Sequence, residues 1–251
     1  MSPALRLALK AEWTKLRTLP GTIWQLLSVV ALTILVSAGA AASVRCSTGH
    51  CDQDLAKISL TGVLLGQAVV AIVAVLVATN EYSTGLIHVT LTAMPRRAAV
   101  LAAKATIVTG LILVAGALGV AGSMLAGRLI LPGLSIGDGP VLRAAAGSVL
   151  YLALIALLGL GIATMVRDTA VSIGAVLGLL YLFPVIAAVA TSERWQRHLQ
   201  QIGPMSAGLA VQATTHLDEL PIGPWAGLGV LAAWAAGALL VGGVLLQLRD
   251  A

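Results

Sequence analysis

The chain has 251 residues, of which 59% are hydrophobic and only 10% are charged. A soluble domain has roughly 45–50% apolar and about 25% charged residues, so a water-soluble fold is excluded. The formal net charge of +5 does not indicate nucleic acid as a partner, because the basic residues lie beside apolar runs and form no basic face with interleaved aromatic side chains. The composition therefore indicates a protein embedded in membrane lipids.

The N-terminal segment, residues 3–19, has the periodicity of a helix. At about 100° per residue, Leu5, Leu9 and Leu16 fall on one arc, and basic residues lie alongside them. The pattern predicts an amphipathic helix lying in the membrane surface. The alternative is a basic tail without fixed structure that directs membrane insertion. Pro20 and Gly21 then supply a break before the first span.

Six apolar runs follow, each near the length of about 20 residues that a helix needs to cross a bilayer. They cover residues 22–43, 59–79, 100–125, 142–166, 170–190 and 223–246. We therefore predict an all-α polytopic membrane protein, with six transmembrane helices in a single domain over residues 1–251. An even number of spans puts both termini on one side.

The basic residues near the ends of the spans predict the orientation, since they are enriched in cytoplasmic loops. With both termini in the cytoplasm, nine of them lie inside: Arg6, Lys10, Lys15, Arg17, Arg96, Arg97, Lys104, Arg167 and Arg249. Six then lie outside: Arg45, Lys57, Arg128, Arg143, Arg194 and Arg197. Cytoplasmic termini are the better fit, chiefly because the segment before the first span is so basic.

Two predicted outer segments carry features of their own. Cys46 and Cys51 flank a short loop in an oxidising location, where a disulfide is expected. The sharper alternative is a metal site in which His50 and Asp52 join the two thiols. Residues 191–222 mix apolar residues with Pro and Gly, which indicates a partly buried extracellular helix or a re-entrant piece.

The sequence contains no catalytic machinery. No stretch matches the phosphate-binding pattern G-x-x-x-x-G-K-[ST], so energy for active transport would come from a partner. Ionisable residues are absent from the middle of the predicted spans, which disfavours a carrier coupled to an ion gradient. We expect a chain that is not an enzyme, holds no metal and binds no cofactor itself.

Small residues recur at the spacing that lets helices approach closely. They occur at Gly174 and Gly178, at Gly223 and Gly227, and at Gly116, Gly119 and Gly122. The sequence leaves open whether they pack within one subunit or across a dimer. Among the polar residues in the spans, Gln67 could line a substrate path, although such groups more often satisfy neighbouring helices.

The segment 81–97, Glu-Tyr-Ser-Thr-Gly-Leu-Ile-His-Val-Thr-Leu-Thr-Ala-Met-Pro-Arg-Arg, resembles the first cytoplasmic loop of type-2 ABC exporter permeases, with Lys104 following in the next span. Residues 11–17, Ala-Glu-Trp-Thr-Lys-Leu-Arg, resemble the N-terminal elbow helix of actinobacterial members. Residues 224–227 and 248–251 are similar to their last span and tail. The loop departs from many relatives at Leu86 and His88.

The resemblance implies a permease subunit of the bacterial cytoplasmic membrane, multi-pass, with both termini cytoplasmic. Two such subunits, as a homodimer or with a close paralogue, would rest on two cytoplasmic ABC ATPase chains, which bind the ATP and Mg. Segment 80–97 would be the coupling loop, with a coupling helix between spans 2 and 3. The residues matched to the ATPase contact are Glu81, Tyr82, Gly85, Leu91, Pro95, Arg96 and Arg97.

Elementary chemistry agrees with this assignment. A carboxylate at Glu81 suits the first turn of a helix, Gly85 permits close backbone approach, and Pro95 stops a helix. An ordinary cytosolic loop with basic anchors would have the same local features. Arg167 and Asp168, in the other short cytoplasmic turn, could form a second ATPase contact or a simple hairpin between helices.

The predicted function is outward movement of a hydrophobic or amphiphilic substrate by alternating access, driven by ATP. An antibiotic or other drug, a lipid or a small peptide would suit the apolar spans, and drug efflux would confer antibiotic resistance. The alternative is a membrane anchor or assembly subunit that holds a cytoplasmic partner without transporting anything.

Overall fold

The computed structural model describes residues 14, 20–44, 53–83, 97–131 and 133–248. Across these ranges the secondary structure is helical and no strand occurs. Six helical segments are long and apolar enough to cross a membrane. The predicted all-α fold with six spans is thus confirmed. The predicted coupling helix, and the predicted elbow helix apart from Thr14, lie outside the described residues.

The spans match the predicted apolar runs closely. They are α2 (Pro20–Ser43), α4 (Val63–Ser83), α6 (Arg97–Ile130), α7 (Gly139–Val166), the broken span α8–η1–α9 (Thr169–Leu177, Gly178–Leu182, Phe183–Val189) and α12 (Pro224–Leu248). Shorter elements at one end are α3 (Leu55–Ser59), α10 (Glu193–Ile202), α11 (Pro204–Leu209), η2 (Ala210–Gln212) and η3 (Leu217–Glu219). The main differences are a longer α6 and a second span that begins four residues later than residue 59.

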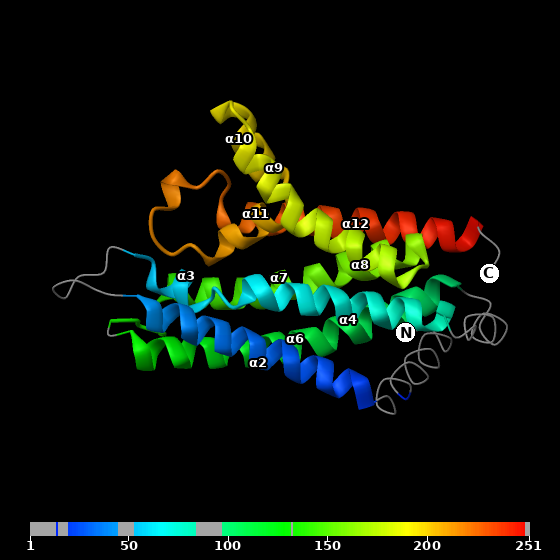
Figure 1. The fold of residues 1–251 in the computed structure, drawn as a ribbon, viewed down its shortest axis with the longest axis horizontal. Coiled ribbons are helices and arrows are strands. Elements are labelled where there is room, and N and C mark those ends of the chain that lie inside the picture. Colours follow the sequence, from blue (N-terminus) through cyan, green and yellow to red (C-terminus); the bar gives the residue numbers. More distant parts are fainter. Residues whose placement is uncertain (1–13, 15–19, 45–52, 84–96, 132, 249–251) are drawn as a thin grey trace.

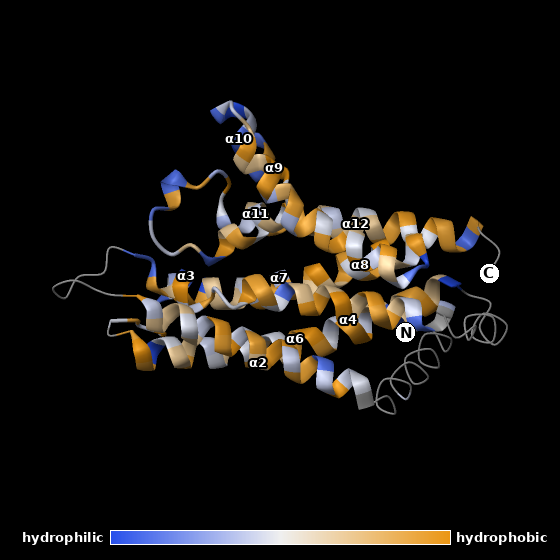
Figure 2. Cartoon of the chain, viewed as in Figure 1, coloured by the Kyte–Doolittle hydropathy of each residue, from blue (hydrophilic) through white to orange (hydrophobic). Residues whose placement is uncertain are grey.

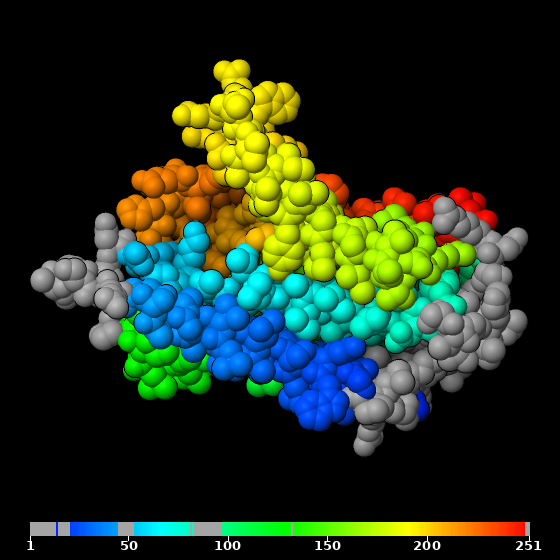
Figure 3. All heavy atoms as spheres, in the orientation of Figure 1, coloured from blue at the N-terminus to red at the C-terminus, as the bar shows by residue number. Residues whose placement is uncertain are grey.

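The fifth span is interrupted in its middle. The α-helical α8 widens into the π-helix η1, and α9 resumes with Pro184 in its first turn. Proline has no backbone N–H to donate to the preceding turn, and π-helical segments are a recognised cause of bends in helices. Beyond α9 the chain folds back through α10, so α9 and α10 form a hairpin that stands away from the bundle (Figures 1 and 3).

Helix α7 is the centre of the bundle. It packs against α4, α6 and α12, while α2 packs against α6 and α4 (Figure 1). Its side chains include the largest fully buried ones, among them Tyr151, Leu152 and Ile155. The other spans bury some of their apolar side chains and expose others, such as Leu35 and Leu240. Their ribbons are mostly orange, the colour of hydrophobic residues (Figure 2).

The two ends of the bundle differ. One end of the bundle is called the coupling end. It contains the start of α2, the end of α4, the start of α6, the turn between α7 and α8 and the end of α12 (Figure 1). Elements α3, α11, η2 and η3 lie toward the opposite, outer end. Both termini of the described spans therefore lie at the same end, as the even number of spans predicts. The basic residues predict that this end faces the cytoplasm.

Some of the glycines at helix-packing spacing face a neighbouring helix of the same chain, and others do not. A Cβ added to Gly161 would lie 2.7 Å from Ala238 Cβ, so α7 and α12 meet there almost backbone to backbone. On α6, Gly116 faces Leu152, and Gly119 faces Thr33. By contrast, added Cβ atoms at Gly174 and Gly178 meet nothing within 4 Å. Span three thus uses its small residues inside the subunit, while those two glycines face out of it.

The contrast between Gly161 and Gly174 can be tested. Alanine lacks the conformational freedom of glycine and favours a helix by roughly 0.5–1 kcal/mol. We expect Gly174→Ala to leave the melting temperature unchanged or raised, and Gly161→Ala to lower it, because overpacking costs about 1–3 kcal/mol. Thermal unfolding in one detergent compares the two; equal melting temperatures would contradict the close α7–α12 contact.

One carboxylate holds the outer end together. Asp54 precedes α3 and accepts a hydrogen bond from the backbone N–H of Lys57 at 3.0 Å. It also accepts bonds from the N–H of Thr214 at 2.5 Å, the hydroxyl of Thr214 at 2.7 Å and the N–H of Thr215 at 3.2 Å. Burial acts to raise the pKa of Asp54, but the four hydrogen bonds outweigh it and hold that pKa below its usual value.

Asp54→Asn is expected to destabilise the chain by on the order of 1–2 kcal/mol, since an amide accepts these bonds less strongly than a carboxylate. The matched control is Asp138→Asn, because Asp138 precedes α7 but makes no side-chain capping bond. Because folding lowers the pKa of Asp54, its carboxylate stabilises the fold fully at pH values above the pKa of the unfolded state. That stabilisation is lost as the pH falls below 3.8 and through the lower pKa of the folded state. The melting temperatures of the wild type and Asp54→Asn should therefore differ most above about pH 5 and converge as the pH falls below 3.8.

Candidate coupling site at one end of the bundle

The structure locates both ends of the predicted coupling loop. Glu81 and Tyr82 lie in the last turn of α4, and Arg97 begins α6. The remaining predicted contact residues lie outside the described residues, as does the side chain of Glu81: Gly85, Leu91, Pro95 and Arg96. Cys46 and Cys51 also lie outside them.

The end of α4 contacts the turn between α7 and α8. The guanidinium carbon of Arg167 lies 5.4 Å from the centre of the Tyr82 ring, within range for a cation–π interaction. One turn earlier, the Thr169 hydroxyl donates to the Thr79 hydroxyl at 2.8 Å. The two predicted cytoplasmic segments are therefore in direct contact, which the sequence did not indicate.

The backbone of Arg167 is unusual for its residue type. Its φ is 63°, in the left-handed region, and its N–H closes the last turn of α7 on the carbonyl of Ala163. Glycine is the common residue at such a helix end, because a side chain there costs roughly 1–2 kcal/mol. The strained position is occupied by a residue whose side chain makes the contact with Tyr82, which suggests that the contact matters more than the local strain.

Two nitrogens of the Arg167 guanidinium, Nε and Nη2, are buried without a hydrogen-bond partner among the described residues. A guanidinium stays protonated in proteins, so burial does not neutralise it. The face of Tyr82 is one contact that is available to this charge. A contact of this kind, partly removed from water, is worth more than one fully in solvent.

Asp168 is engaged in shaping the same turn. Its carboxylate accepts the backbone N–H of Val171 at 2.8 Å and caps α8, and its carbonyl accepts the hydroxyl of Ser172 at 2.5 Å. Aspartate is among the preferred residues for this position, since it satisfies an N–H that lacks a partner in the helix. Of the predicted pair, Arg167 therefore contacts α4 and Asp168 caps α8.

The first two turns of α6 attach to two other spans. Arg97 donates from Nη1 to the carbonyl of Leu246 at 2.8 Å, in the last turn of α12. Lys104, which is 6% exposed, donates to the carbonyl of Val77 in α4 at 3.1 Å. The carbonyls in the last turn of a helix lack partners within the helix and carry its negative end, so a cation from a neighbouring helix suits Leu246. The sequence predicted Arg97 as a cytoplasmic residue of the ATPase contact and gave no sign of the bond to α12.

Gln67 of α4 lies in the buried interior of the helix bundle. Its side chain is fully buried, accepts the hydroxyl of Tyr151 and contacts Met205 Sδ from Nε2 at 3.3 Å. Nearby, the hydroxyl of Tyr181 donates to the carbonyl of Leu64 at 2.5 Å. These bonds join α4, α7, η1 and α11, and a role for Gln67 on a substrate path would require them to open.

A double-mutant cycle can measure the contact between Tyr82 and Arg167. Tyr82→Leu removes the ring but keeps an apolar side chain, and Arg167→Gly removes the cation at a position whose backbone suits glycine. We expect Tyr82→Leu to lower the free energy of unfolding by about 1 kcal/mol more when Arg167 is present than when it is glycine. The same loss in both backgrounds would mean that the pair is not coupled.

Comparison with known proteins agrees with this geometry. Residues 8–191 match the family model described as ABC-2 family transporter protein, a match that covers well over half of the chain and includes the whole coupling end except α12. A search of curated proteins finds no match. Six apolar spans and the matched region support the resemblance inferred from the loop, and the chain belongs to the ABC-2 family of transporter membrane proteins.

Proposed function

We propose that the chain is the membrane-spanning subunit of an ATP-driven exporter, and that it moves a hydrophobic or amphiphilic molecule outward. The observation that carries the proposal is the network at the coupling end. There, the two helices that bracket segment 81–97 bind the α7–α8 turn through Tyr82 and Arg167, and the end of α12 through Arg97. Family membership supports the permease part of the proposal.

The proposed mechanism begins with two cytoplasmic ATPase chains, which hold the ATP and Mg. Their closure would push on segment 81–97. Lys104 binds α6 to α4, so both helices would move together. The bonds of Tyr82 and Arg97 would carry the displacement to α7, α8 and α12, and the bundle would tilt as a unit against a second permease subunit. A path at the interface of the two bundles would then change the side to which it opens.

The character of the cargo follows from the surfaces available. Many large apolar side chains are exposed on the spans, such as Leu35 at 69% and Leu240 at 70%. In the described spans, the charged residues lie in the last turn of α4, within the first turns of α6, at its far end and near the start of α7. A neutral apolar surface suits a drug, a lipid or an apolar peptide better than an ion or a sugar. Drug efflux, and with it antibiotic resistance, is the biological role that such cargo would serve.

The direct test is copurification with an ABC ATPase, which we expect a neighbouring reading frame to encode. The chain in its native membrane pair should form a stable complex with that ATPase. Glu81→Ala should lower ATP hydrolysis by the complex several-fold, because it removes a carboxylate from the proposed contact. The matched control is Glu219→Ala, which removes an exposed carboxylate from η3 at the outer end and should leave hydrolysis unchanged.

Two results would count against the proposal. If no ATPase copurifies, the chain is better explained as a membrane anchor for another partner. If a complex forms but Glu81→Ala and Glu219→Ala hydrolyse ATP at the wild-type rate, segment 81–97 does not transmit the work of the ATPase, whatever else it binds.

A further inference from the structure

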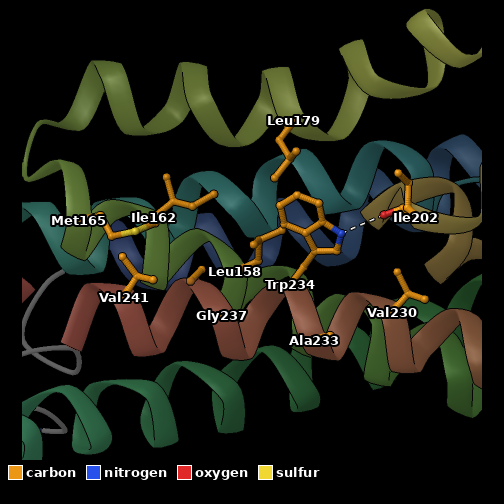
Figure 4. A pocket seen from close by; sticks show the side chains of 11 residues that line it. Leu158, Ile162, Met165, Leu179, Ile202, Val230, Ala233, Trp234, Gly237 and Val241 are labelled. Atoms are coloured by element: carbon orange, nitrogen blue, oxygen red, sulfur yellow. Dashed lines mark hydrogen bonds between the residues drawn. The ribbon is translucent and has the colours of Figure 1, made fainter. Parts of the chain in front are cut away.

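An apolar groove of about 640 Å³ runs between α7, η1 and α12. Val230, Trp234, Gly237 and Val241 form its floor along α12, and Leu179 of η1 faces them across it (Figure 4). Residues from the second half of α7 close the side, and Ile202 at the end of α10 borders the end nearest Val230.

The lining offers almost nothing polar. Its one side-chain N–H belongs to Trp234, and that group already donates to the carbonyl of Ile202 at 2.9 Å (Figure 4). Binding sites for polar small molecules usually carry a few polar groups that fix the orientation of the ligand. This groove has none to spare, so its chemistry matches a plain hydrocarbon chain.

The dimensions fit the same occupant. Val230 and Val241 are eleven residues apart on α12, and at about 1.5 Å per residue the floor is about 16 Å long. Half of a hydrocarbon core about 30 Å thick is about 15 Å, which is the depth that one acyl chain spans.

The groove also joins the surface that lipid covers. Leu240 is 70% exposed and Val244 is 53% exposed on α12, next to the residues of the floor, and Leu182 of η1 is 57% exposed. Within a bilayer, hydrocarbon is the solvent in contact with these side chains. We propose that the groove between α7, η1 and α12 is a binding site for one acyl chain of a membrane phospholipid.

Gly237 permits a specific test, because a Cβ added there meets nothing within 4 Å. Gly237→Leu should fill the floor with side chain and leave the helix packing intact. The matched control is Gly174→Leu, which adds the same side chain to α8 at another open position that does not line the groove. Both replace a helical glycine, so any gain in helix propensity is shared.

Native mass spectrometry of the chain in mild detergent should detect one retained phospholipid per chain. We expect the retained fraction to be the same in Gly174→Leu and to fall at least tenfold in Gly237→Leu. Equal retention in the two variants, or no retention by the wild type, would overturn the proposal.

A second measurement does not depend on Gly237→Leu folding. In a variant with Trp13, Trp24, Trp195 and Trp225 replaced by Phe, fluorescence reports on Trp234 alone. Titration in nanodiscs with phospholipids brominated on the acyl chain should quench Trp234 with saturation at a low fraction of brominated lipid. Quenching that only follows the bulk fraction of brominated lipid would refute a site and leave ordinary contact with lipid.

Discussion

Every polar group within the spans must find its partner inside the protein, because hydrocarbon offers none. The centre of this bundle meets that requirement with few groups. Gln67 and Tyr151 bond each other, Ser148 bonds its own helix, and the hydroxyl of Thr33 bonds the carbonyl of Val29. Ser123 of α6 also bonds the carbonyl of Thr33 in α2. Around these bonds the packing is mostly apolar, with α7 enclosed by its neighbours and with small residues that let α12 approach it. The rigidity of the subunit thus depends on close contact rather than on charge.

At the coupling end, cations join helices to one another. There, Arg97, Lys104 and Arg167 each reach to a helix other than their own, where Arg97 and Lys104 bind a carbonyl and Arg167 binds an aromatic face. Such contacts keep a cation at the level of the headgroups while tying helices together. The same three residues that favour a cytoplasmic orientation therefore also hold the spans in register, which explains how one short segment could act on several helices at once.

The sequence was sufficient for the features that depend on composition. Hydropathy gave the number of spans and most of their limits, because the length of a span is fixed by the thickness of the bilayer. The family was recognisable from segment 81–97 and is confirmed by the matched region. The coupling helix, the elbow helix and the cysteine pair are still predictions, since they lie outside the described residues.

Tertiary contacts were beyond the sequence. Nothing near Arg97 indicates that it binds the last turn of α12, which lies 149 residues away. Nothing in Arg167 and Asp168 distinguishes a left-handed arginine stacked on Tyr82 from an ordinary turn. The glycines illustrate the same limit, because Gly116 and Gly174 have equal local signatures but face a neighbouring helix and open space respectively.

The break in the fifth span has a mechanical consequence. At η1 and Pro184 the regular ladder of backbone hydrogen bonds is interrupted, so bending there costs less than elsewhere along the same span. In the proposed mechanism, a rotation of α8 that starts at Arg167 would be absorbed in part at this joint, so the α9–α10 hairpin would move less than α8. The hollow that this hairpin borders with α3 and the segment after η2 can keep its shape through a cycle of tilting.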